Sequence, residues 1–545
     1  MRADPSGWRT RLDTDTEERY RTNGAWEGQT VADQLVRLAA AQPKQALYLD
    51  DTGALTVSET LDHATRLANA LAHLGLKRGD VVSFQLPNWR EAAIIDLASC
   101  LAGYVCNPIV PIYRDAEVGF ILADARSKVF FIPAHFKTYD FGAMMARLRT
   151  RCPDLRHVVV VRGQGDESSY DALLAETASG QLIRPDPNDV KLLLYTSGTT
   201  SAPKGVLHTH NTVNAEVRAF STHLKLTKED VILMPSTLCH VTGYIYGIQM
   251  PILLGARAVL MEAWDASRAA DLIECHAVTF TIGATPFLRE LAQFAEQHDR
   301  ALPTLRLFPT GGAPVPPDVV RHAERAFAHC RSFRVFGSTE APTITLGELG
   351  AASSEERATT EGRVVGHEVK VIRPDGETAR SGESGEIVAR GPEVCVGYTD
   401  WEQNDAFDDE GFFHTGDLGH FTSDGYLVIT GRAKDIIIRG GENISPKELE
   451  DVLYKNPGIR LAAVVSMFHP RLGETCCAYV TLSSNAGFDL HAMRALFAAS
   501  GVAKQKWPER LEVVSEMPTT AAGKIRKNLL REDIAGKLAA ERVSH

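Results

Sequence analysis

Residues 192–210 read LLLYTSGTTSAPKGVLHTH, an apolar run followed by a loop of small and hydroxyl-bearing residues that ends in Pro-Lys-Gly. Small residues let backbone N–H groups approach a phosphate closely, hydroxyl groups add hydrogen bonds, and Lys204 adds positive charge. A Walker A loop would carry Gly-Lys-Ser/Thr at a helix N-terminus, whereas here Lys204 precedes Gly205 and a β-branched run follows. The stretch therefore predicts a polyphosphate-binding loop of another kind. The simpler alternative is a solvated Ser/Thr loop between two strands.

The composition is that of a globular protein with more than one domain. The chain has 545 residues, which exceeds the usual size of one compact domain. Its formal net charge of −11 disfavours nonspecific binding to nucleic acid or to an anionic membrane, because both need basic patches. The nine cysteines include no pair at CxxC spacing and suggest no zinc cluster. Since the N-terminus lacks the apolar core of a signal peptide, we expect a cytoplasmic protein with reduced thiols and no membrane span.

Helices and strands are expected to alternate through most of the chain. A capping box at residues 56–59 begins an amphipathic helix that should end at Gly75, and residues 81–86 then read as a strand. This alternation implies α/β layers with buried parallel strands. The same helix-then-strand order recurs at 92–101 and 106–110, at 118–125 and 129–132, and at 266–276 and 278–282.

The pattern changes after about Gly385, where short strands and turns dominate. A charged connector, GRAKD at residues 431–435, then precedes a compact unit of the size of an independent domain. Ser445 followed by Pro446 predicts a helix start within that unit. We therefore expect a large N-terminal domain of layered α/β subdomains, residues 1–432, and a small α+β C-terminal domain, residues 433–545.

The loop at residues 196–205 resembles the phosphate-binding signature of the adenylate-forming (ANL) superfamily, which includes acyl-CoA synthetases, adenylation domains of nonribosomal peptide synthetases and firefly-type luciferases. Ser201 stands where that family usually has glycine. Six further segments match the family in the right order and cover nearly the whole chain. Residues 282–288 and 439–445 look most like bacterial medium-chain fatty-acid and cyclohexanecarboxylate CoA ligases.

The resemblance implies a site for ATP and Mg²⁺. Thr339 would contact the α-phosphate, Glu340 would hold Mg²⁺, and Asp417 with Arg432 would bind the ribose. Phe336 keeps the stacking face of the tyrosine that the family usually has there. The implied catalytic residues are Lys524, Thr339, Glu340 and Lys204. The implied ATP-binding residues are Thr196, Ser197, Gly198, Thr199, Thr200, Lys204, Gly312, Ala313, Pro314, Phe336, Gly337, Ser338, Thr339, Asp417, Arg432 and Lys524.

The C-terminal domain is expected to supply different residues to two successive steps. Lys524, in PTTAAGKIR at residues 518–526, matches the lysine that bridges the carboxylate substrate and the α-phosphate in the family. Lys434 matches the hinge residue. Arg439, Gly440 and Gly441 would bind CoA, with the glycines letting the pantetheine arm pass close to the backbone.

The resemblance also implies an acyl pocket. His240 would touch either the acyl carboxylate or the path to the thioester. Gly243, Tyr244 and Gly247 suggest room for a chain or a ring, including a bulky alicyclic or terpenoid acid. The implied lining residues are His240, Val241, Gly243, Tyr244, Gly283 and Gly311.

These roles predict an acid–thiol ligase that activates a medium-chain, alicyclic or other bulky hydrophobic acid with ATP and transfers the acyl group to CoA. No carrier-protein segment follows His545, which favours free CoA as acceptor. Three alternatives stay open: a stand-alone adenylating enzyme that passes the acyl group to a carrier protein or partner enzyme, a luciferase-like oxygenase, and a non-catalytic nucleotide-binding protein. A homodimer is also left open.

Overall fold

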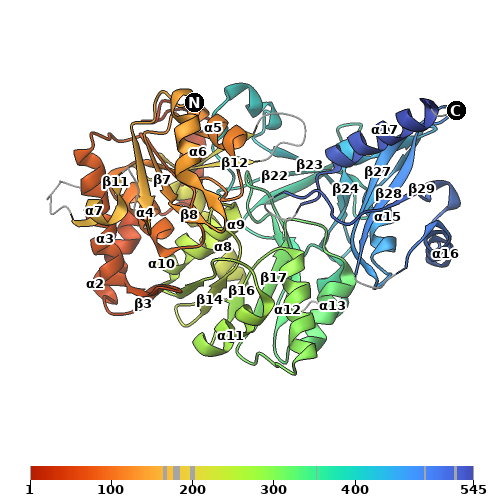
Figure 1. Ribbon diagram of the computed structural model, residues 1–545, viewed down its shortest axis with the longest axis horizontal. Helices are drawn as coiled ribbons and strands as arrows, with labels where there is room; N and C mark the ends of the chain where they lie inside the picture. The colour runs from red at the N-terminus through yellow and green to blue at the C-terminus, as the bar shows by residue number, and fades with distance from the viewer. Residues whose placement is uncertain are drawn as a thin grey trace.

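The computed structural model has a large N-terminal part and a smaller C-terminal part, drawn at the left and at the right in blue in Figure 1. It describes residues 2–163, 168–175, 184–196, 203–350, 353–483, 487–520 and 524–543. Within these ranges no helix combines the length and the apolar character that a bilayer crossing needs.

A seven-stranded sheet, counted over the described residues, forms one layer of the N-terminal part, with the strand order β11-β10-β7-β5-β6-β12-β13. Neighbouring strands are parallel except for the β12–β13 hairpin. The inner strands are apolar and buried, as expected for a parallel sheet covered on both faces. The strands are β5 (Val81–Phe84), β6 (Val105–Pro108), β7 (Val129–Pro133), β10 (His157–Val161), β11 (Ser168–Ser169), β12 (Val190–Thr196) and β13 (Lys204–Thr209).

A second sheet, with nine strands among the described residues, has the order β20-β19-β18-β17-β16-β14-β15-β3-β4. Its middle strands are parallel, and its two ends are antiparallel. The predicted α/β class is confirmed by this architecture. The strands are β3 (Ala46–Asp50), β4 (Gly53–Thr56), β14 (Val231–Met234), β15 (Arg257–Leu260), β16 (Phe280–Thr281), β17 (Leu307–Gly311), β18 (Arg331–Phe336), β19 (Thr345–Leu346) and β20 (Arg363–Val364).

Helices connect and cover these strands. The predicted capping box is present at the start of α3, where the Thr56 hydroxyl accepts a hydrogen bond from the Glu59 amide. Helix α4 is apolar around nearly its whole circumference and is buried from Ala92 to Ala102, which fits its place inside the core. The helices of this part that bear on the site are α3 (Val57–His73), α4 (Arg90–Ala102), α5 (Asp115–Asp124), α8 (His210–Leu224), α11 (Ala266–His276), α12 (Thr285–Gln297) and α13 (Pro317–Ala326).

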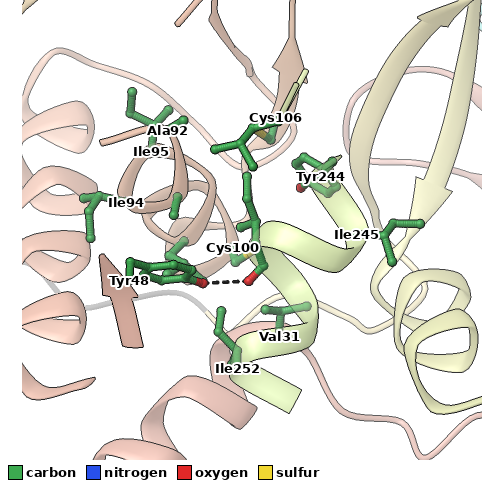
Figure 2. Close-up of a cluster of buried hydrophobic side chains, with 14 of the residues drawn as sticks. Val31, Tyr48, Ala92, Ile94, Ile95, Cys100, Cys106, Tyr244, Ile245 and Ile252 are labelled. Carbon is green, nitrogen blue, oxygen red and sulfur yellow. Dashed lines mark hydrogen bonds between the residues drawn. The ribbon is translucent and has the colours of Figure 1, made fainter. Parts of the chain in front are cut away.

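The main core contains a few polar groups, and several of them have hydrogen-bond partners. Figure 2 shows Tyr48 and Tyr244 among buried aliphatic side chains such as Ile94. The Tyr48 hydroxyl donates to the carbonyl of Ile248 across 2.6 Å. Pairing of this kind offsets the cost of removing a hydroxyl from water.

The C-terminal part follows a four-stranded antiparallel sheet, β21-β22-β23-β24, and the short helix η4 (Ala433–Asp435). It contains its own two apolar clusters, one around Leu449 and Val464 and one around Ala463 and Leu530. The predicted boundary at residues 432–435 falls at η4, and the independence of the two domains stays a prediction. The elements are β21 (Glu368–Ile372), β22 (Gly385–Arg390), β23 (Phe413–Phe421), β24 (Leu427–Arg432), β25 (Ile437–Arg439), β26 (Glu442–Ile444), α15 (Pro446–Leu453), β27 (Ile459–His469), β28 (Gly473–Leu482), α16 (Leu490–Ser500), β29 (Arg510–Val513) and α17 (Lys527–Val543).

Candidate active site

Four of the segments singled out in the sequence meet at the carboxyl ends of parallel strands. The chain reaches His240 after β14 and Gly283 after β16, while β17 and β18 end in Gly311 and Phe336. Ligands of open α/β sheets bind at this edge, because loops that leave neighbouring strands converge there. The predicted acyl and adenine segments therefore lie along one rim of the nine-stranded sheet.

The base of the predicted phosphate loop is formed by the β12–β13 hairpin. Thr196 and Lys204 face each other as its last pair. A Cβ on Gly205 would lie 2.7 Å from the side chain of Thr399, so close packing requires glycine after the lysine. The predicted ATP-binding residues Ser197, Gly198, Thr199 and Thr200 lie outside the described residues, as does Ser201.

The predicted adenine segment contains two glycines, and glycine is required at each position for a different structural reason. A Cβ on Gly311 would overlap the carbonyl of Val335 on the adjacent strand. Gly312 has a φ of +75° and open space around the position of a Cβ, so its backbone is accessible to a flat ligand. Ala313 and Pro314 follow, and the Pro314 carbonyl is held by the Thr285 hydroxyl of α12 at 3.2 Å.

Thr339 is positioned by a histidine that the sequence analysis did not single out. Nε2 of His208 lies 2.8 Å from the Thr339 carbonyl, and its Nδ1 lies 3.1 Å from the Thr212 hydroxyl. Because a carbonyl only accepts, Nε2 carries the proton and donates. Burial lowers the pKa of His208 to about 4, so the ring is neutral at pH 7. The turn itself needs Gly337, since a Cβ there would overlap the carbonyl of Pro342.

Glu340 is held by Tyr398, a second residue that the sequence analysis missed. The Tyr398 hydroxyl donates to Oε1 of Glu340 at 3.0 Å, and the Cys395 amide donates to the Glu340 carbonyl at 2.8 Å. Nζ of Lys204 lies 5.4 Å from the centroid of the same tyrosine ring. Tyr398 thus joins the phosphate-loop lysine to the predicted metal ligand. Its only sequence signal was its place beside Gly397, after a predicted strand.

Asp417 and Arg432 form the predicted ribose pair. They lie opposite each other on β23 and β24, and Nε of Arg432 donates to Oδ1 of Asp417 at 2.7 Å. The aspartate side chain is only 10% exposed. The arginine therefore fixes the orientation of a carboxylate, and the paired oxygens of a carboxylate suit hydrogen bonds from the two hydroxyls of a ribose.

Lys524 reaches the same rim from the C-terminal part. The ammonium group of Lys524 interacts electrostatically with four charged side chains: Arg432, Asp417, Glu340 and Lys434. Crowding by protein atoms and the nearby Arg432 lower its pKa to about 8. Because Lys524 also keeps access to water, the shift reflects a crowded cleft and not a sealed interior.

His240 lies between the acyl segment and Lys524. Its Nδ1 accepts from the Thr242 amide at 3.4 Å and caps the short helix α9 (Val241–Tyr244), so Nε2 carries the proton of the neutral ring. Burial and the charge of Lys524 lower its pKa to about 4. His240 is therefore a neutral hydrogen-bond donor at pH 7.

The room that the sequence suggested at Gly243, Tyr244 and Gly247 is not found there. A Cβ on Gly243 would overlap the carbonyl of Thr237, and a Cβ on Gly247 would lie 2.7 Å from Met234, so both glycines serve close packing. Tyr244 is fully buried among core side chains (Figure 2). Its hydroxyl donates to the carboxylate of Asp96. The sequence analysis read small residues as open space, whereas the neighbouring backbone and side chains already occupy it. Gly283 lies at the rim close to the Ser236 hydroxyl, whereas Val241 is buried at the start of α9.

The predicted CoA segment forms the β25–β26 hairpin, at whose tip lie Gly440 and Gly441. Their φ values are +59° and +92°, so the turn requires glycine even without a passing ligand. Arg439 pairs with Glu509, and its Nε donates to the Thr475 hydroxyl at 3.2 Å. A CoA-binding role for these three residues, and a hinge role for Lys434 in η4, stay predictions.

The residues present fit ATP and Mg²⁺. Mg²⁺ is usually bound by one or two carboxylates together with substrate phosphates and water, and Glu340 offers an oriented carboxylate close to Lys204 and Thr339. The accessible backbone at Gly312 fits the ring of a nucleotide, and Asp417 fits its ribose.

Comparison with known proteins identifies the family of the chain. The model described as "AMP-binding enzyme" matches residues 35–399, and the model described as "AMP-binding enzyme C-terminal domain" matches residues 448–524. The chain belongs to the AMP-binding enzyme family. Membership of the adenylate-forming superfamily is thereby confirmed, and so is its consequence that the chain is an enzyme. ATP, Mg²⁺ and CoA, predicted as cofactors, are those of the CoA ligases in this family.

Individual relatives cover nearly the whole chain. A medium-chain fatty-acid–CoA ligase from Escherichia coli is 37% identical over 96% of this chain and 93% of its own. A salicyl-AMP ligase/salicyl-S-ArCP synthetase from Mycobacterium tuberculosis is 32% identical over 94% of this chain and 92% of its own. The crystal structure of ATP-bound MatB from Rhodopseudomonas palustris is 26% identical, covers 93% of this chain and 99% of its own, and gives a TM-score of 0.83. This family therefore includes relatives named for transfer to CoA and relatives named for loading a carrier protein.

Proposed function

We propose that this enzyme activates a hydrophobic carboxylic acid as an acyl-adenylate and transfers the acyl group to CoA. The observation that carries this proposal is the meeting of Lys524 from the C-terminal part with Glu340, Asp417 and Arg432 of the N-terminal part. Nucleotide binding alone does not need a cation at that place, whereas the approach of a carboxylate to a phosphate does.

In the first step a carboxylate oxygen attacks the α-phosphorus of ATP, and pyrophosphate leaves. Lys524 lies where it would reduce the repulsion between the two anions, and Lys204 would hold the phosphates. Glu340, oriented by Tyr398, would hold Mg²⁺, which neutralises charge on the phosphates when it is bound. Neutral His240 would donate a hydrogen bond from Nε2 to the acyl carboxylate.

In the second step the thiol attacks the acyl carbon, and AMP leaves with the oxygen that came from the acid. We infer that the C-terminal part turns about Lys434 between the steps, which removes Lys524 and brings Arg439, Gly440 and Gly441 to the rim. The position of η4 between β24 and β25, outside both apolar clusters of the C-terminal part, supports a hinge there.

A medium-chain or alicyclic acid is the proposed substrate class. The similarity to the E. coli medium-chain ligase supports it. Transfer to a carrier protein is the second candidate, and the relative named for salicyl-S-ArCP synthesis favours it.

A comparison of acceptors tests the proposal. The purified enzyme, ATP and Mg²⁺ are incubated with fatty, alicyclic and aryl acids, and pyrophosphate release is measured first without acceptor. CoA and a phosphopantetheinylated carrier protein are then offered with the best acid. The proposal predicts a thioester of CoA with a medium-chain or alicyclic acid. Thioester on the carrier alone would establish the second candidate, and acid-dependent oxygen uptake or light would establish a luciferase-like oxygenase.

A further inference from the structure

Arg289 makes a contact between the two parts of the molecule. In sequence, Arg289 lies far from residues 433–435, which connect the two parts covalently. It lies on α12 of the N-terminal part, and its Nη1 donates to the carbonyl of Arg460, on β27 of the C-terminal part, at 2.7 Å. Its guanidinium carbon lies 5.8 Å from the centroid of the Tyr454 ring, which ends α15. A charged hydrogen bond and a cation–π contact thus join the same side chain to the C-terminal part.

The surface that Arg289 contacts is rigid. The Tyr454 hydroxyl donates to the carbonyl of Ala462 at 3.3 Å and accepts from the Ala462 amide at 3.0 Å. These bonds tie the end of α15 to β27, so Tyr454 and Arg460 move together with the whole C-terminal part. A contact of Arg289 with Tyr454 and Arg460 therefore restrains the position of the whole C-terminal part.

Helix α12 is itself anchored to the active-site rim. Leu288, Leu291, Ala292 and Ala295 are buried at helical spacing, which fixes the helix on the N-terminal core and directs Arg289 to another side. Its first residue, Thr285, donates to the carbonyl of Pro314 in the predicted adenine segment. Arg289 therefore stands on an element that also contacts the nucleotide side of the rim.

The connector at residues 433–435 joins the two parts covalently, and the contact of Arg289 with Arg460 and Tyr454 joins them at other residues, which restrains rotation about the connector. The Ser445 hydroxyl also donates to the carbonyl of Thr430, which lies on β24 close in sequence to the connector. The contact of Arg289 exists in the arrangement in which Lys524 is near Glu340 and Asp417. Any turn about η4 would carry Arg460 and Tyr454 away from Arg289.

We propose that Arg289 is a positioning residue that holds the C-terminal part in the arrangement that delivers Lys524 to the active site. This inference rests on the proposed function, because it assigns Arg289 to the acyl-adenylate step and requires its contact to break before the thiol step. Arg289 touches no reacting atom and acts through the placement of Lys524.

The test compares Arg289→Ala, Arg289→Lys and the control Arg268→Ala. Arg268 lies on neighbouring α11 and pairs with Asp51 inside the N-terminal part, so its loss removes a surface arginine and leaves the contact between the parts intact. Two rates are measured for each: pyrophosphate release without CoA, and thioester formation from supplied acyl-adenylate and CoA. Arg289→Ala should lower the first about tenfold, in line with the loss of a hydrogen bond to a charged group, and leave the second unchanged. Arg289→Lys should recover part of the loss, because the cation over Tyr454 remains, and Arg268→Ala should match the wild type.

Limited trypsin digestion gives a readout that does not depend on activity. The connector contains Arg432 and Lys434, and its cleavage should accelerate in Arg289→Ala and not in Arg268→Ala. Equal loss of both rates, or unchanged pyrophosphate release together with unchanged cleavage, overturns the role of Arg289. If the wild type releases no acid-dependent pyrophosphate while Arg289→Ala is cleaved faster, the restraint stands and the proposed function fails.

Tyr454→Leu should reproduce the effect of Arg289→Ala. In the double variant, the loss of pyrophosphate release, expressed as a free energy, should be smaller than the sum of the losses in the two single variants.

Discussion

The hydroxyl of Tyr398 donates a hydrogen bond to Oε1 of Glu340 across 3.0 Å, while the ring of the same tyrosine lies beside Nζ of Lys204. Tyr398 is 2% exposed, so water does not replace this bond when it is lost. The residue thus orients the proposed ligand of Mg²⁺ through its hydroxyl and contacts the ammonium group of Lys204 through its ring. The ring contact and the hydroxyl contact can be separated by mutation.

Tyr398→Phe should keep the ring beside Lys204 and release the Glu340 carboxylate. We expect pyrophosphate release at limiting Mg²⁺ to fall about fivefold to tenfold, in keeping with about 1–1.5 kcal/mol for one hydrogen bond, and to recover at high Mg²⁺. The measurement is a Mg²⁺ titration of the acid-dependent reaction. Tyr426→Phe is the matched control, because the Tyr426 hydroxyl donates to Glu348 at the same distance of 3.0 Å. An unchanged Mg²⁺ requirement in Tyr398→Phe would remove the tyrosine from the metal site.

Lys524→Ala should separate the two half-reactions. Loss of one electrostatic contact to developing charge typically costs about 10²–10³ in rate, so acyl-adenylate formation should fall by that factor. Thioester formation from supplied acyl-adenylate should stay near the wild-type rate, since Lys524 is proposed to leave the site before that step. Equal damage to both half-reactions would contradict this division of roles.

The rate of acyl-adenylate formation should decline at alkaline pH. Lys524 assists only when it is protonated, and its pKa in the cleft is about 8, so assistance is complete below pH 8 and is lost as the pH rises through that value. We expect the plot of log kcat/KM for ATP against pH to bend downward near pH 8. Lys524→Arg keeps its charge at all these pH values, so any activity that it retains should show no such bend. A bend at the same pH in Lys524→Arg would assign the titration to another group.

Lys434→Pro should block the thiol step more than the acyl-adenylate step. Proline fixes its own φ and restricts the residue before it, so rotation within Ala433–Asp435 becomes costly. Acyl-adenylate should accumulate and be transferred slowly to CoA. Lys434→Ala, which removes the charge but leaves the backbone free, is the control. Normal thioester formation by a folded Lys434→Pro enzyme would mean that rotation occurs elsewhere.

The elements of the site could be predicted from the sequence wherever the signal is local. The apolar run located the strand that ends in Thr196, the small and hydroxyl-bearing residues located the loop before Lys204, and the capping box located the start of α3. The motifs also identified His240 and Gly311, which the structure places after and at the carboxyl ends of parallel strands. These features follow from residues close together in the chain.

The remaining features depend on contacts between residues far apart in the sequence. No local sequence pattern predicts such pairs. Examples are the hydrogen bonds of His208 with Thr339, Tyr398 with Glu340, and Arg289 with Arg460. The reading of Gly243 and Gly247 as open space was wrong for the same reason, since the space at each Cβ is filled by residues of neighbouring segments. For Gly440 and Gly441 the positive φ values show that the turn itself requires glycine, whereas the sequence analysis had attributed both glycines to close approach of CoA.

Isotope transfer from the acid tests the central claim, acyl-adenylate chemistry, most directly. The acid is labelled with oxygen-18 in its carboxylate and incubated with the enzyme, ATP, Mg²⁺ and CoA, and the nucleotide products are examined by mass spectrometry. The account predicts that AMP forms and carries one oxygen-18 atom, because a carboxylate oxygen attacks the α-phosphorus and stays with it when the thiol displaces AMP. Formation of ADP with the label in inorganic phosphate would contradict it, since that result requires attack at the γ-phosphorus.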